Sequence, residues 1–334
     1  MDEKKYAVNI KNLKVRFSTE DGVVEAVNGI DLQIEKGKTL GLVGETGAGK
    51  TTTALAVLRL IPSPPGEIID GTIEIEGKNI FECSEKEMES IRGQEVSMIF
   101  QDPMTSLNPV LTVGEQIAEV ILLHEKTDKK TAMDKAKEML EMVGIPGDRA
   151  SEYPHQFSGG MKQRVIIAMA LVCNPNFLIA DEPTTALDVT IQAQVLDLMG
   201  KLREKYNTST LMITHDLGIV AEVCDDVAIM YAGKIVEKGN LEDIFNNTKH
   251  PYTEGLFGSL PNIEKRHEKL KPIPGLMPDP TNLPKGCPFS PRCKYCKDIC
   301  KTRAPKCTML SDTHMVACLA YEEGTGVTLE GEEK

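Results

Sequence analysis

The chain has 334 residues, of which 41% are hydrophobic and 4% aromatic, so it is long enough for about two folding units with a mainly aliphatic core. Its 38 Lys and Arg residues against 50 Asp and Glu residues give a net charge of −12, which argues against binding to a nucleic-acid backbone. The longest apolar stretch, Val165 to Cys173, is too short to span a bilayer, and Met1 leads into charged residues rather than a secretory signal, so we expect a cytosolic protein.

Short β-branched runs alternate with longer segments of helical pattern in the first part of the chain. This alternation is typical of an α/β fold with crossover units around a largely parallel sheet. The expected strands are Thr39–Val43, Val96–Phe100, Phe177–Ala180 and Thr210–Thr214. Residues Thr112–Val143 have a helical pattern that we expect to break near the capping residue Asp128, which predicts a small helical subdomain.

The C-terminal part has a different composition. Prolines recur through Lys271–Pro291, so this segment is expected to be a linker or an irregular wrap rather than a helix or a central strand. Residues Tyr321–Lys334 carry five Glu and few aliphatic side chains, and we expect them to be disordered. The predicted division is residues 1–260, a proline- and cysteine-rich extension over 261–320, and an acidic tail over 321–334.

A glycine-rich segment follows the first expected strand. Its sequence, Gly44-Glu45-Thr46-Gly47-Ala48-Gly49-Lys50-Thr51, fits the phosphate-loop pattern G-x-x-x-x-G-K-[ST], and a helical pattern follows through Leu60. Inward-facing backbone N–H groups can bind phosphate oxygens, while Lys50 reaches the β- and γ-phosphates and Thr51 offers its hydroxyl to Mg²⁺. The alternative, an ordinary glycine turn beside a surface lysine, fits poorly between a strand and a helix.

Two further segments carry residues suited to nucleotide chemistry. The buried-type strand Phe177–Ala180 leads into Asp181, which can hold Mg²⁺, and Glu182, which can orient or deprotonate a water molecule. Two solvated acids at a strand end are the alternative. Ser158 to Gln163 open a long helix with a Ser and two Gly, an anion-binding geometry, although a capped helix start without a ligand would explain this segment better in isolation.

Five motifs occur in an order that resembles the nucleotide-binding subunit of an ABC transporter. They are Gly44–Thr51, Ser158–Gln163, Phe177–Glu182, Thr185–Asp188 and Thr214–Asp216. The resemblance covers roughly residues 6–260 and implies a P-loop NTPase fold with a RecA-like core, an antiparallel β subdomain and a helical subdomain. It also implies a head-to-tail dimer, in which the Ser158–Gln163 signature of one subunit closes over nucleotide held by the phosphate loop of the other.

The resemblance assigns roles to single residues. Glu182, His215 and Gln101 would be catalytic, with His215 contacting the γ-phosphate and Gln101 sensing Mg²⁺ and the γ-phosphate while facing the membrane partner. The Mg²⁺ residues would be Thr51, Gln101 and Asp181. Nucleotide contacts are expected from Phe17, Gly44, Glu45, Thr46, Gly47, Ala48, Gly49, Lys50, Thr51, Thr52, Ser158, Gly159, Gly160 and Gln163, with Asp188 at the dimer contact.

Phe17 is the best match to the family's aromatic residue that stacks on adenine. The hairpin Ser18–Val24 places it farther from Gly44 in sequence than in short family members. Phe17 could equally be a core residue, so both interpretations stay open.

Two C-terminal features narrow the family. His250-Pro251-Tyr252-Thr253 and Gly286-Cys287-Pro288-Phe289-Ser290-Pro291-Arg292-Cys293 resemble the extension of ATPases from dipeptide, oligopeptide and nickel importers. We therefore predict the D-type ATPase of a dipeptide or oligopeptide importer, with a nickel importer as the alternative. The resemblance implies a peripheral protein at the cytoplasmic face of the membrane. Its partners would be two integral-membrane permease subunits, a second similar ATPase and an extracytoplasmic peptide-binding protein.

Six cysteines lie between Cys287 and Cys318 with the spacing C-x5-C-x2-C-x3-C-x6-C-x10-C. Disulfides are not expected in a cytosolic chain. The spacing of the cysteines favours a site for zinc or an iron-sulfur cluster over six unligated thiols. The family pattern has cysteines at the positions of Cys287, Cys293, Cys300 and Cys318, and implies a 4Fe-4S cluster in a small irregular C-terminal domain. Cys296 and Cys307 are additional, and the run Cys293, Cys296 and Cys300 could instead supply three local ligands.

Overall fold

The computed structural model of the chain describes residues 5–101, 106–185, 187–259 and 272–329. The strands are β1 (Tyr6–Thr19), β2 (Gly22–Glu35), β3 (Thr39–Val43), β4 (Gly66–Ile75), β5 (Lys78–Asn79), β6 (Val96–Ile99), β7 (Phe177–Asp181), β8 (Ser209–Thr214), β9 (Asp226–Tyr231), β10 (Lys234–Asn240), β11 (Thr308–Met309) and β12 (Met315–Val316). The α-helices are α1 (Lys50–Val57), α2 (Glu85–Ile91), α4 (Val113–His124), α5 (Lys129–Met142), α6 (Gly159–Leu171), α7 (Val189–Tyr206), α8 (Leu217–Val223), α9 (Leu241–Phe245), α10 (Pro251–Gly258) and α11 (Asp298–Thr302).

The main sheet runs through the middle of the molecule. Its strand order is β11-β12-β10-β9-β3-β8-β7-β6, and the strands from β9 to β6 pair in parallel. Every residue of β3, β7 and β8 is buried, as expected for parallel strands covered on both faces. The strands predicted from sequence are confirmed to within one residue at each end. Because they are parallel, their carboxyl ends meet at the same edge of the sheet.

A second, antiparallel sheet with the order β2-β1-β4-β5 packs beside the main one. Its long hairpin turns between Thr19 and Gly22, which pair with each other. Its apolar face joins helix α1 in one hydrophobic cluster that includes Leu13, Ile30 and Ala54. This sheet is the antiparallel β subdomain that the resemblance implies.

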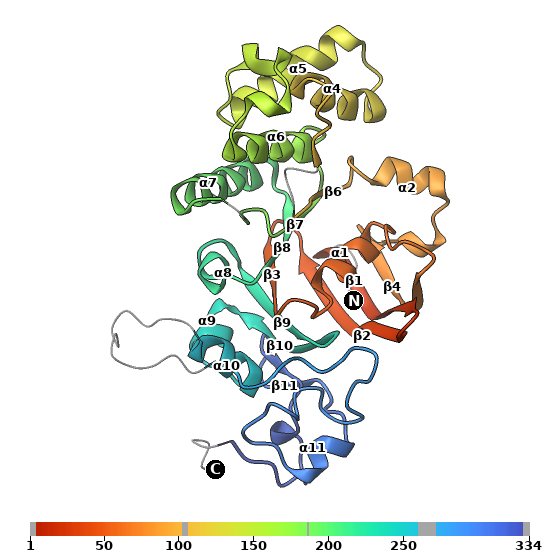
Figure 1. Cartoon of the computed structure of the whole chain (residues 1–334), viewed down its shortest axis with the longest axis vertical. Helices are drawn as coiled ribbons and strands as arrows, with labels where there is room; N and C mark the ends of the chain where they lie inside the picture. Colours follow the sequence, from red (N-terminus) through yellow and green to blue (C-terminus); the bar gives the residue numbers. More distant parts are fainter. Residues whose placement is uncertain (1–4, 102–105, 186, 260–271, 330–334) are drawn as a thin grey trace.

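The helical subdomain lies at one end of the long axis, where α4, α5 and α6 are stacked (Figure 1). Thr112 caps α4 through a reciprocal pair of hydrogen bonds with Glu115, and the Asp128 side chain accepts a hydrogen bond from the Thr131 N–H at the start of α5. The predicted break near Asp128 is therefore confirmed, because this residue ends one helical pattern by capping the next.

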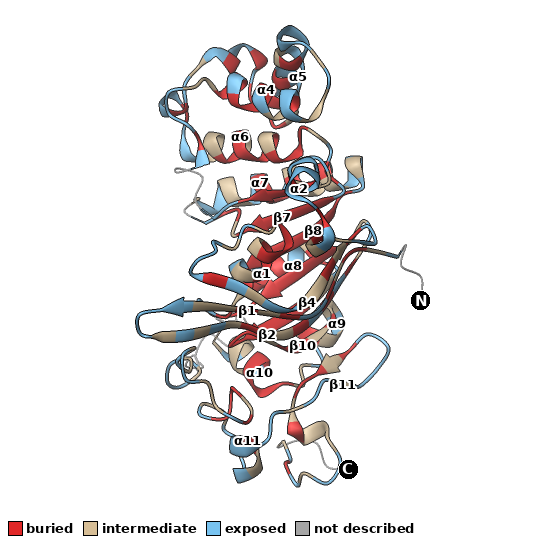
Figure 2. Cartoon of the chain, turned by 90° about the vertical axis from the view of Figure 1, so that its right-hand side faces the viewer, coloured by how far each residue is buried: buried red, intermediate tan, exposed pale blue. Residues whose placement is uncertain are grey.

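Buried residues are concentrated along the main sheet and on α6, while the tip of the β1–β2 hairpin is exposed (Figure 2). None of the helices in the described ranges is long and apolar enough to cross a bilayer.

The C-terminal extension adds to the edge of the main sheet. Strand β12 pairs antiparallel with β10, and β11 pairs with β12. Residues 272–297 contain no helix or strand, as the prolines predict, while residues 260–271 lie outside the described part of the chain. The predicted boundary at residue 260 falls in that undescribed segment and stays a prediction.

The structure differs from the expected disorder in residues 321–329. Val327 is buried and packs with Leu319 and Cys300 in a small apolar cluster. The Thr325 hydroxyl donates a hydrogen bond of 2.6 Å to the Leu319 carbonyl oxygen. The Glu322 carboxylate also accepts a hydrogen bond of 2.7 Å from the Lys306 N–H, so this stretch is held by contacts with the rest of the extension that the acidic composition does not reveal. Residues 330–334 lie outside the described part of the chain.

A buried contact between Glu237 and His314 links the extension to strand β10. The Glu237 carboxylate is 2.8 Å from His314 Nε2, and both side chains are almost fully buried. The same carboxylate accepts hydrogen bonds from the backbone N–H groups of Lys249, at 2.6 Å, and His250, at 3.1 Å. Glu237 therefore joins β10, the segment before α10 and the residue before β12 at one point.

Replacing Glu237 by Ala should lower the free energy of unfolding by about 3 kcal/mol, because a buried imidazole and two amide groups lose their acceptor. Urea unfolding followed by circular dichroism measures the loss. The control is Glu67→Ala, which removes an exposed partner of Arg16 and should cost much less. Equal losses in the two variants would show that the buried pair does not anchor the extension.

Candidate functional site

The phosphate loop lies between β3 and α1, at the carboxyl edge of the main sheet. Gly47 and Gly49 have φ angles of 82° and 104°, a backbone region that favours glycine. A Cβ on Gly44 would lie 2.2 Å from the Met230 carbonyl oxygen, and one on Gly49 would lie 2.4 Å from the Ala26 carbonyl oxygen. The loop is thus packed against β9 and β2 with no space for side chains at Gly44 and Gly49.

Lys50 is buried inside this loop. Its Nζ donates hydrogen bonds to the carbonyl oxygens of Gly44, at 2.7 Å, and Glu45, at 3.0 Å. Burial lowers the pKa of Lys50, while the charges of Glu182, Asp181 and Glu45 oppose that shift. The ammonium group therefore stands at the centre of the loop, held by neutral carbonyl groups.

Thr51 and Asp181 come together from α1 and the end of β7. The Thr51 hydroxyl donates a hydrogen bond of 2.8 Å to Asp181 Oδ2. Burial raises the pKa of the Asp181 carboxyl; the Thr51 hydrogen bond opposes this, and the neighbouring Glu182 charge adds to it. A hydroxyl and a buried carboxylate are oxygen ligands of the kind that Mg²⁺ prefers, so these residues fit the predicted ion.

Glu182 is the centre of a polar cluster. Its φ angle is 48°, unusual for a residue with a side chain, and its N–H donates a hydrogen bond of 2.8 Å to the Ile213 carbonyl oxygen. The carboxylate accepts hydrogen bonds from Gln101 Nε2 at 3.0 Å and Thr185 Oγ1 at 2.9 Å. His215 Nδ1 lies 3.0 Å from the other carboxylate oxygen. The structure thus brings the three predicted catalytic residues, Gln101, Glu182 and His215, into direct contact.

These hydrogen bonds also set the charge of Glu182. Burial acts to raise the pKa of its carboxyl, but the hydrogen bonds with His215, Thr185 and Gln101 outweigh burial and lower this pKa below its usual value. The carboxylate is therefore ionised at neutral pH and can accept a proton or a hydrogen bond from water.

The signature segment begins α6, away from the phosphate loop of the same chain. The Ser158 side chain caps the helix by accepting a hydrogen bond of 3.4 Å from the Met161 N–H, and Gln163 Nε2 donates one of 2.6 Å to the Pro183 carbonyl oxygen. The Asp188 carboxylate caps α7 through the Ile191 N–H. In the views of Figures 1 and 2, α6 is separated from α1 along the long axis.

Phe17, the predicted adenine contact, lies in β1 of the antiparallel sheet. This residue is half-buried in β1 and packs against the same hydrophobic cluster as α1. A Cβ on Gly66 would lie 2.8 Å from Phe17 Cε1, so the ring is close to β4. The core interpretation describes these contacts, and stacking on adenine stays a prediction.

The cysteines predicted to bind metal are gathered but not arranged as a metal site. Cys287, Cys293, Cys300 and Cys318 line one small cavity of about 20 Å³ together with His250. Burial raises the pKa of Cys287 to about 12 and that of Cys293 to about 11, which favours neutral thiols. Within the described ranges, no group of three or more His, Cys, Asp or Glu side chains could hold a metal ion. The predicted C-terminal metal-cluster domain is therefore not confirmed.

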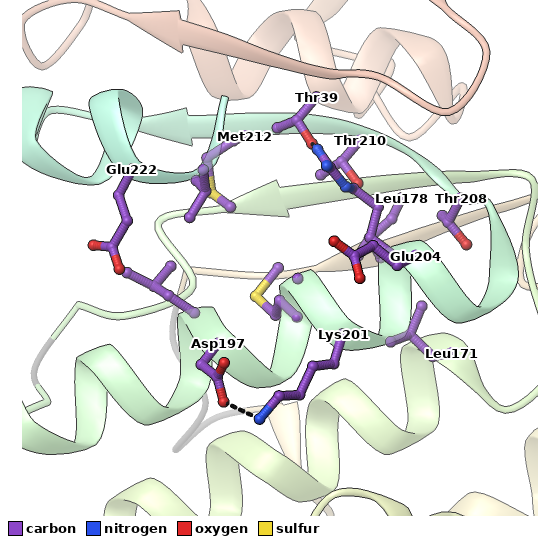
Figure 3. Close-up of a pocket in the computed structure, with 15 residues that line it drawn as sticks. Thr39, Leu171, Leu178, Asp197, Lys201, Glu204, Thr208, Thr210, Met212 and Glu222 are labelled. Atoms are coloured by element: carbon purple, nitrogen blue, oxygen red, sulfur yellow. Dashed lines mark hydrogen bonds and ion pairs between the residues drawn. The ribbon is translucent and has the colours of Figure 1, made fainter. Parts of the chain in front are cut away.

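Another cavity, of about 440 Å³, lies between helices α7 and α8 and the strands of the main sheet (Figure 3). Thr39, at the amino end of β3, lines it, and so does Lys201, which forms an ion pair with Asp197 on α7. Ligands of parallel α/β sheets bind outside the carboxyl ends of the strands. No residue of Gly44–Thr51 lines this cavity, which is therefore separate from the phosphate loop.

Three residues without a role predicted from the sequence also contact the site: Thr185, Tyr252 and Arg292. The Thr185 hydroxyl donates a hydrogen bond to the Glu182 carboxylate. Thr185 belongs to the motif Thr185–Asp188, but the motif did not indicate this contact. The Tyr252 hydroxyl accepts a hydrogen bond of 3.1 Å from the Glu45 N–H, and Arg292 contacts the Glu45 side chain. The motif His250–Thr253 was the available signal for Tyr252, but it indicated a family and not a contact.

Comparison with protein families gives two matches. Residues 27–185 match a family described as "ABC transporter". Residues 236–300 match one described as "Oligopeptide/dipeptide transporter, C-terminal region".

Solved structures of similar proteins include the following two. The dimeric ATP-binding cassette MJ0796 bound to ADP and Pi is 25% identical, with a TM-score of 0.63 over 70% of this chain and 98% of that one. The structure of cbiO1 from Clostridium perfringens, part of the ABC transporter complex cbiONQ, is 26% identical, with a TM-score of 0.63 over 72% of this chain and 91% of that one. The ABC ATPase fold is thereby confirmed.

Relatives from Bacillus subtilis (strain 168) are more similar in sequence. The oligopeptide transport ATP-binding protein OppD is 53% identical over 312 residues, which are 92% of this chain and 87% of that protein. The dipeptide transport ATP-binding protein DppD is 48% identical over 330 residues, 98% of each chain. With about half of its residues identical over nearly its whole length, the chain belongs to the family of ABC transporter ATP-binding subunits for oligopeptides and dipeptides.

Proposed function

We propose that this subunit binds ATP with Mg²⁺ at the phosphate loop and hydrolyses it to power the import of dipeptides or oligopeptides across the cytoplasmic membrane. The observation that carries the proposal is the ionised Glu182 carboxylate, held by Gln101, Thr185 and His215 beside the Thr51–Asp181 pair. These groups have the chemistry needed to hold a metal-bound triphosphate and to activate water.

In this proposal the residues divide the work at the γ-phosphate. Lys50 exchanges its carbonyl partners for phosphate oxygens, and the loop from Gly44 to Thr52 supplies backbone N–H donors. Mg²⁺, held by Thr51, Asp181 and Gln101, would offset the charge on the phosphates when bound. Glu182 orients and deprotonates the attacking water, and His215 contacts the γ-phosphate.

The second half of each site comes from another ATPase subunit. Ser158, Gly159, Gly160 and Gln163 of that subunit close over the nucleotide, and Asp188 lies at the contact between subunits. The separation of α6 from α1 supports this arrangement, since one chain cannot bring its own signature to its own phosphate loop without a large movement. A similar cassette has been solved as a dimer bound to ADP and Pi.

The transported solute is proposed from the relatives, whose names refer to oligopeptides and dipeptides. A nickel importer of the same family is the alternative. The subunit would work at the cytoplasmic face of the membrane with two permease subunits, a second similar ATPase and an extracytoplasmic peptide-binding protein. The test is uptake of labelled peptide and of nickel by cells lacking this subunit, before and after it is restored. Restored peptide uptake supports the proposal, and restored nickel uptake alone contradicts it.

Replacing Glu182 by Gln should lower ATP hydrolysis at least ~100-fold while ATP binding remains, because the group that activates water is lost and the phosphate loop is intact. Phosphate release and equilibrium binding of ATP measure the two effects. Glu67→Gln, at an exposed ion pair on the antiparallel sheet, is the control. Near-normal turnover of the Glu182 variant would contradict the assignment.

Replacing Lys50 by Ala should weaken ATP binding by about 10- to 100-fold as well as turnover, since a charge-assisted contact with the β- and γ-phosphates is lost. The same binding titration measures this loss. Lys201→Ala, an exposed lysine paired with Asp197 on α7, should bind ATP like the unchanged protein. Unchanged affinity in the Lys50 variant would exclude its role in the phosphate loop.

We also propose that Cys287, Cys293, Cys300 and Cys318 bind a 4Fe-4S cluster, with zinc as the alternative. Their common cavity supports this choice, because Cys296 and Cys307 do not line it. Thiolates would have to form and draw closer around the metal, since the buried thiols favour their neutral form. A multi-thiolate site can supply folding free energy to a segment with few aliphatic residues, so we propose a structural role.

Protein purified without oxygen should be brown and hold about four iron atoms per chain. Serine at any of the four cavity cysteines should reduce the iron content, whereas Cys296→Ser and Cys307→Ser should leave it unchanged. Stoichiometric zinc in colourless protein would overturn the iron proposal. Loss of iron in the Cys296 variant alone would instead favour the local run Cys293, Cys296 and Cys300.

A further inference from the structure

The C-terminal extension reaches the phosphate loop through one buried arginine. Arg292 Nη1 lies 3.0 Å from both carboxylate oxygens of Glu45, the second residue of the loop. The Arg292 side chain is 6% exposed and that of Glu45 is 32% exposed, so water has little access to the arginine side of the pair. The two residues are 247 positions apart in sequence, so the contact exists only because the extension folds back over the loop.

Arg292 is itself held in one orientation. Its Nε donates a hydrogen bond of 3.0 Å to the Pro274 carbonyl oxygen, and its Nη1 is 3.4 Å from the Tyr231 hydroxyl. The guanidinium also lies over the Tyr231 ring, 5.9 Å from its centre. A planar guanidinium fixed in this way presents its N–H groups to Glu45 in a defined geometry.

Glu45 is bonded at every polar position. Its side chain meets Arg292, its N–H donates a hydrogen bond of 3.1 Å to the Tyr252 hydroxyl, and its carbonyl oxygen accepts one of 3.0 Å from Lys50 Nζ. Tyr252 lies at the start of α10, where the His250 side chain caps the helix by accepting a hydrogen bond from the Tyr252 N–H. Two elements outside the ATPase motifs therefore set the orientation of this turn of the loop.

The segment before Arg292 follows the same side of the site. The Pro280 carbonyl oxygen accepts a hydrogen bond of 3.0 Å from the Glu25 N–H at the edge of β2. Met277 Cε lies 3.5 Å from the place that a Cβ on Gly47 would occupy. The extension thus passes along both the β1–β2 hairpin and the phosphate loop, and Arg292 is its charged contact with the loop.

We propose that Arg292 is a positioning residue of the nucleotide site, which neutralises Glu45 and orients the phosphate loop so that the extension sets the affinity for ATP. The inference rests on the proposed function, since it takes the loop to be an ATP site. A carboxylate in a phosphate loop repels a triphosphate unless a cation balances it. Arg292 supplies that cation from the extension, and Lys50 remains available for the phosphates.

The test measures equilibrium binding of Mg²⁺-ATP to the full chain. Arg292→Gln should raise the dissociation constant about tenfold, the size expected for loss of one charge-assisted contact. Adding Glu45→Gln to this variant should restore most of the affinity, because it removes the unbalanced carboxylate. The control is Arg303→Gln, which removes an exposed arginine of the same extension that pairs with Glu322 and should leave affinity unchanged.

A second variant separates charge from stability. Arg292→Lys keeps the positive charge but cannot reproduce both the Glu45 and the Pro274 contacts, so its melting temperature should fall while its ATP affinity stays within about twofold of the unchanged protein. If Arg292→Gln fails to fold, the Arg292→Lys variant is the deciding test. An ATP affinity of Arg292→Lys that falls together with its melting temperature would overturn the proposal.

Three other outcomes would each contradict a specific part of the argument. Equal affinities in the Arg292→Gln and Arg303→Gln variants overturn the proposal. Failure of Glu45→Gln to restore affinity overturns the charge argument. Absence of ATP binding by the unchanged protein would instead refute the proposed function, so the two failures are distinguishable.

Discussion

Parallel pairing of β3, β7 and β8 is the constraint on which the rest of the site depends. In this pairing Val43 lies beside Thr214, and Asp181 lies beside Ile213. The residues that follow these strands are therefore neighbours at one edge of the sheet, although they come from three distant parts of the chain. The phosphate loop, the two acidic residues and the histidine meet because their strands do, and because buried parallel strands tolerate little variation in register.

Charge is then distributed over a small volume that holds two carboxylates and two basic side chains. Hydrogen bonds keep Glu182 ionised, while burial favours the neutral forms of Asp181 and Lys50. A cation beside Asp181 and a phosphate beside Lys50 would each offset that burial cost. The positive φ of Glu182 adds backbone strain at the residue that we propose activates water, a frequent feature of reactive positions.

The C-terminal extension contacts the rest of the molecule at two places, the edge of the main sheet and the phosphate loop. At the sheet edge, β12 pairs with β10 and the buried Glu237–His314 pair satisfies groups that would otherwise be costly to bury. At the phosphate loop, Arg292 reaches Glu45 from the segment that also carries the cavity cysteines, since Cys293 is the next residue. Adjacent residues of the C-terminal extension therefore contact the phosphate loop and line the cysteine cavity. This connects the cysteine-rich extension physically to the loop that we propose binds nucleotide.

The sequence by itself determined the features that depend on neighbouring residues: the buried strands, the glycine loop, the cap at Asp128 and the acids that end β7. Fully buried strands must be apolar throughout, and a phosphate loop requires glycine at fixed positions, so both leave a local pattern. Only the tertiary structure decided that Thr185 holds Glu182, that Arg292 and Tyr252 hold Glu45, and that Val327 is buried. Tyr252 and Arg292 are 207 and 247 positions from Glu45, and such contacts follow from how distant segments pack, which no local periodicity encodes.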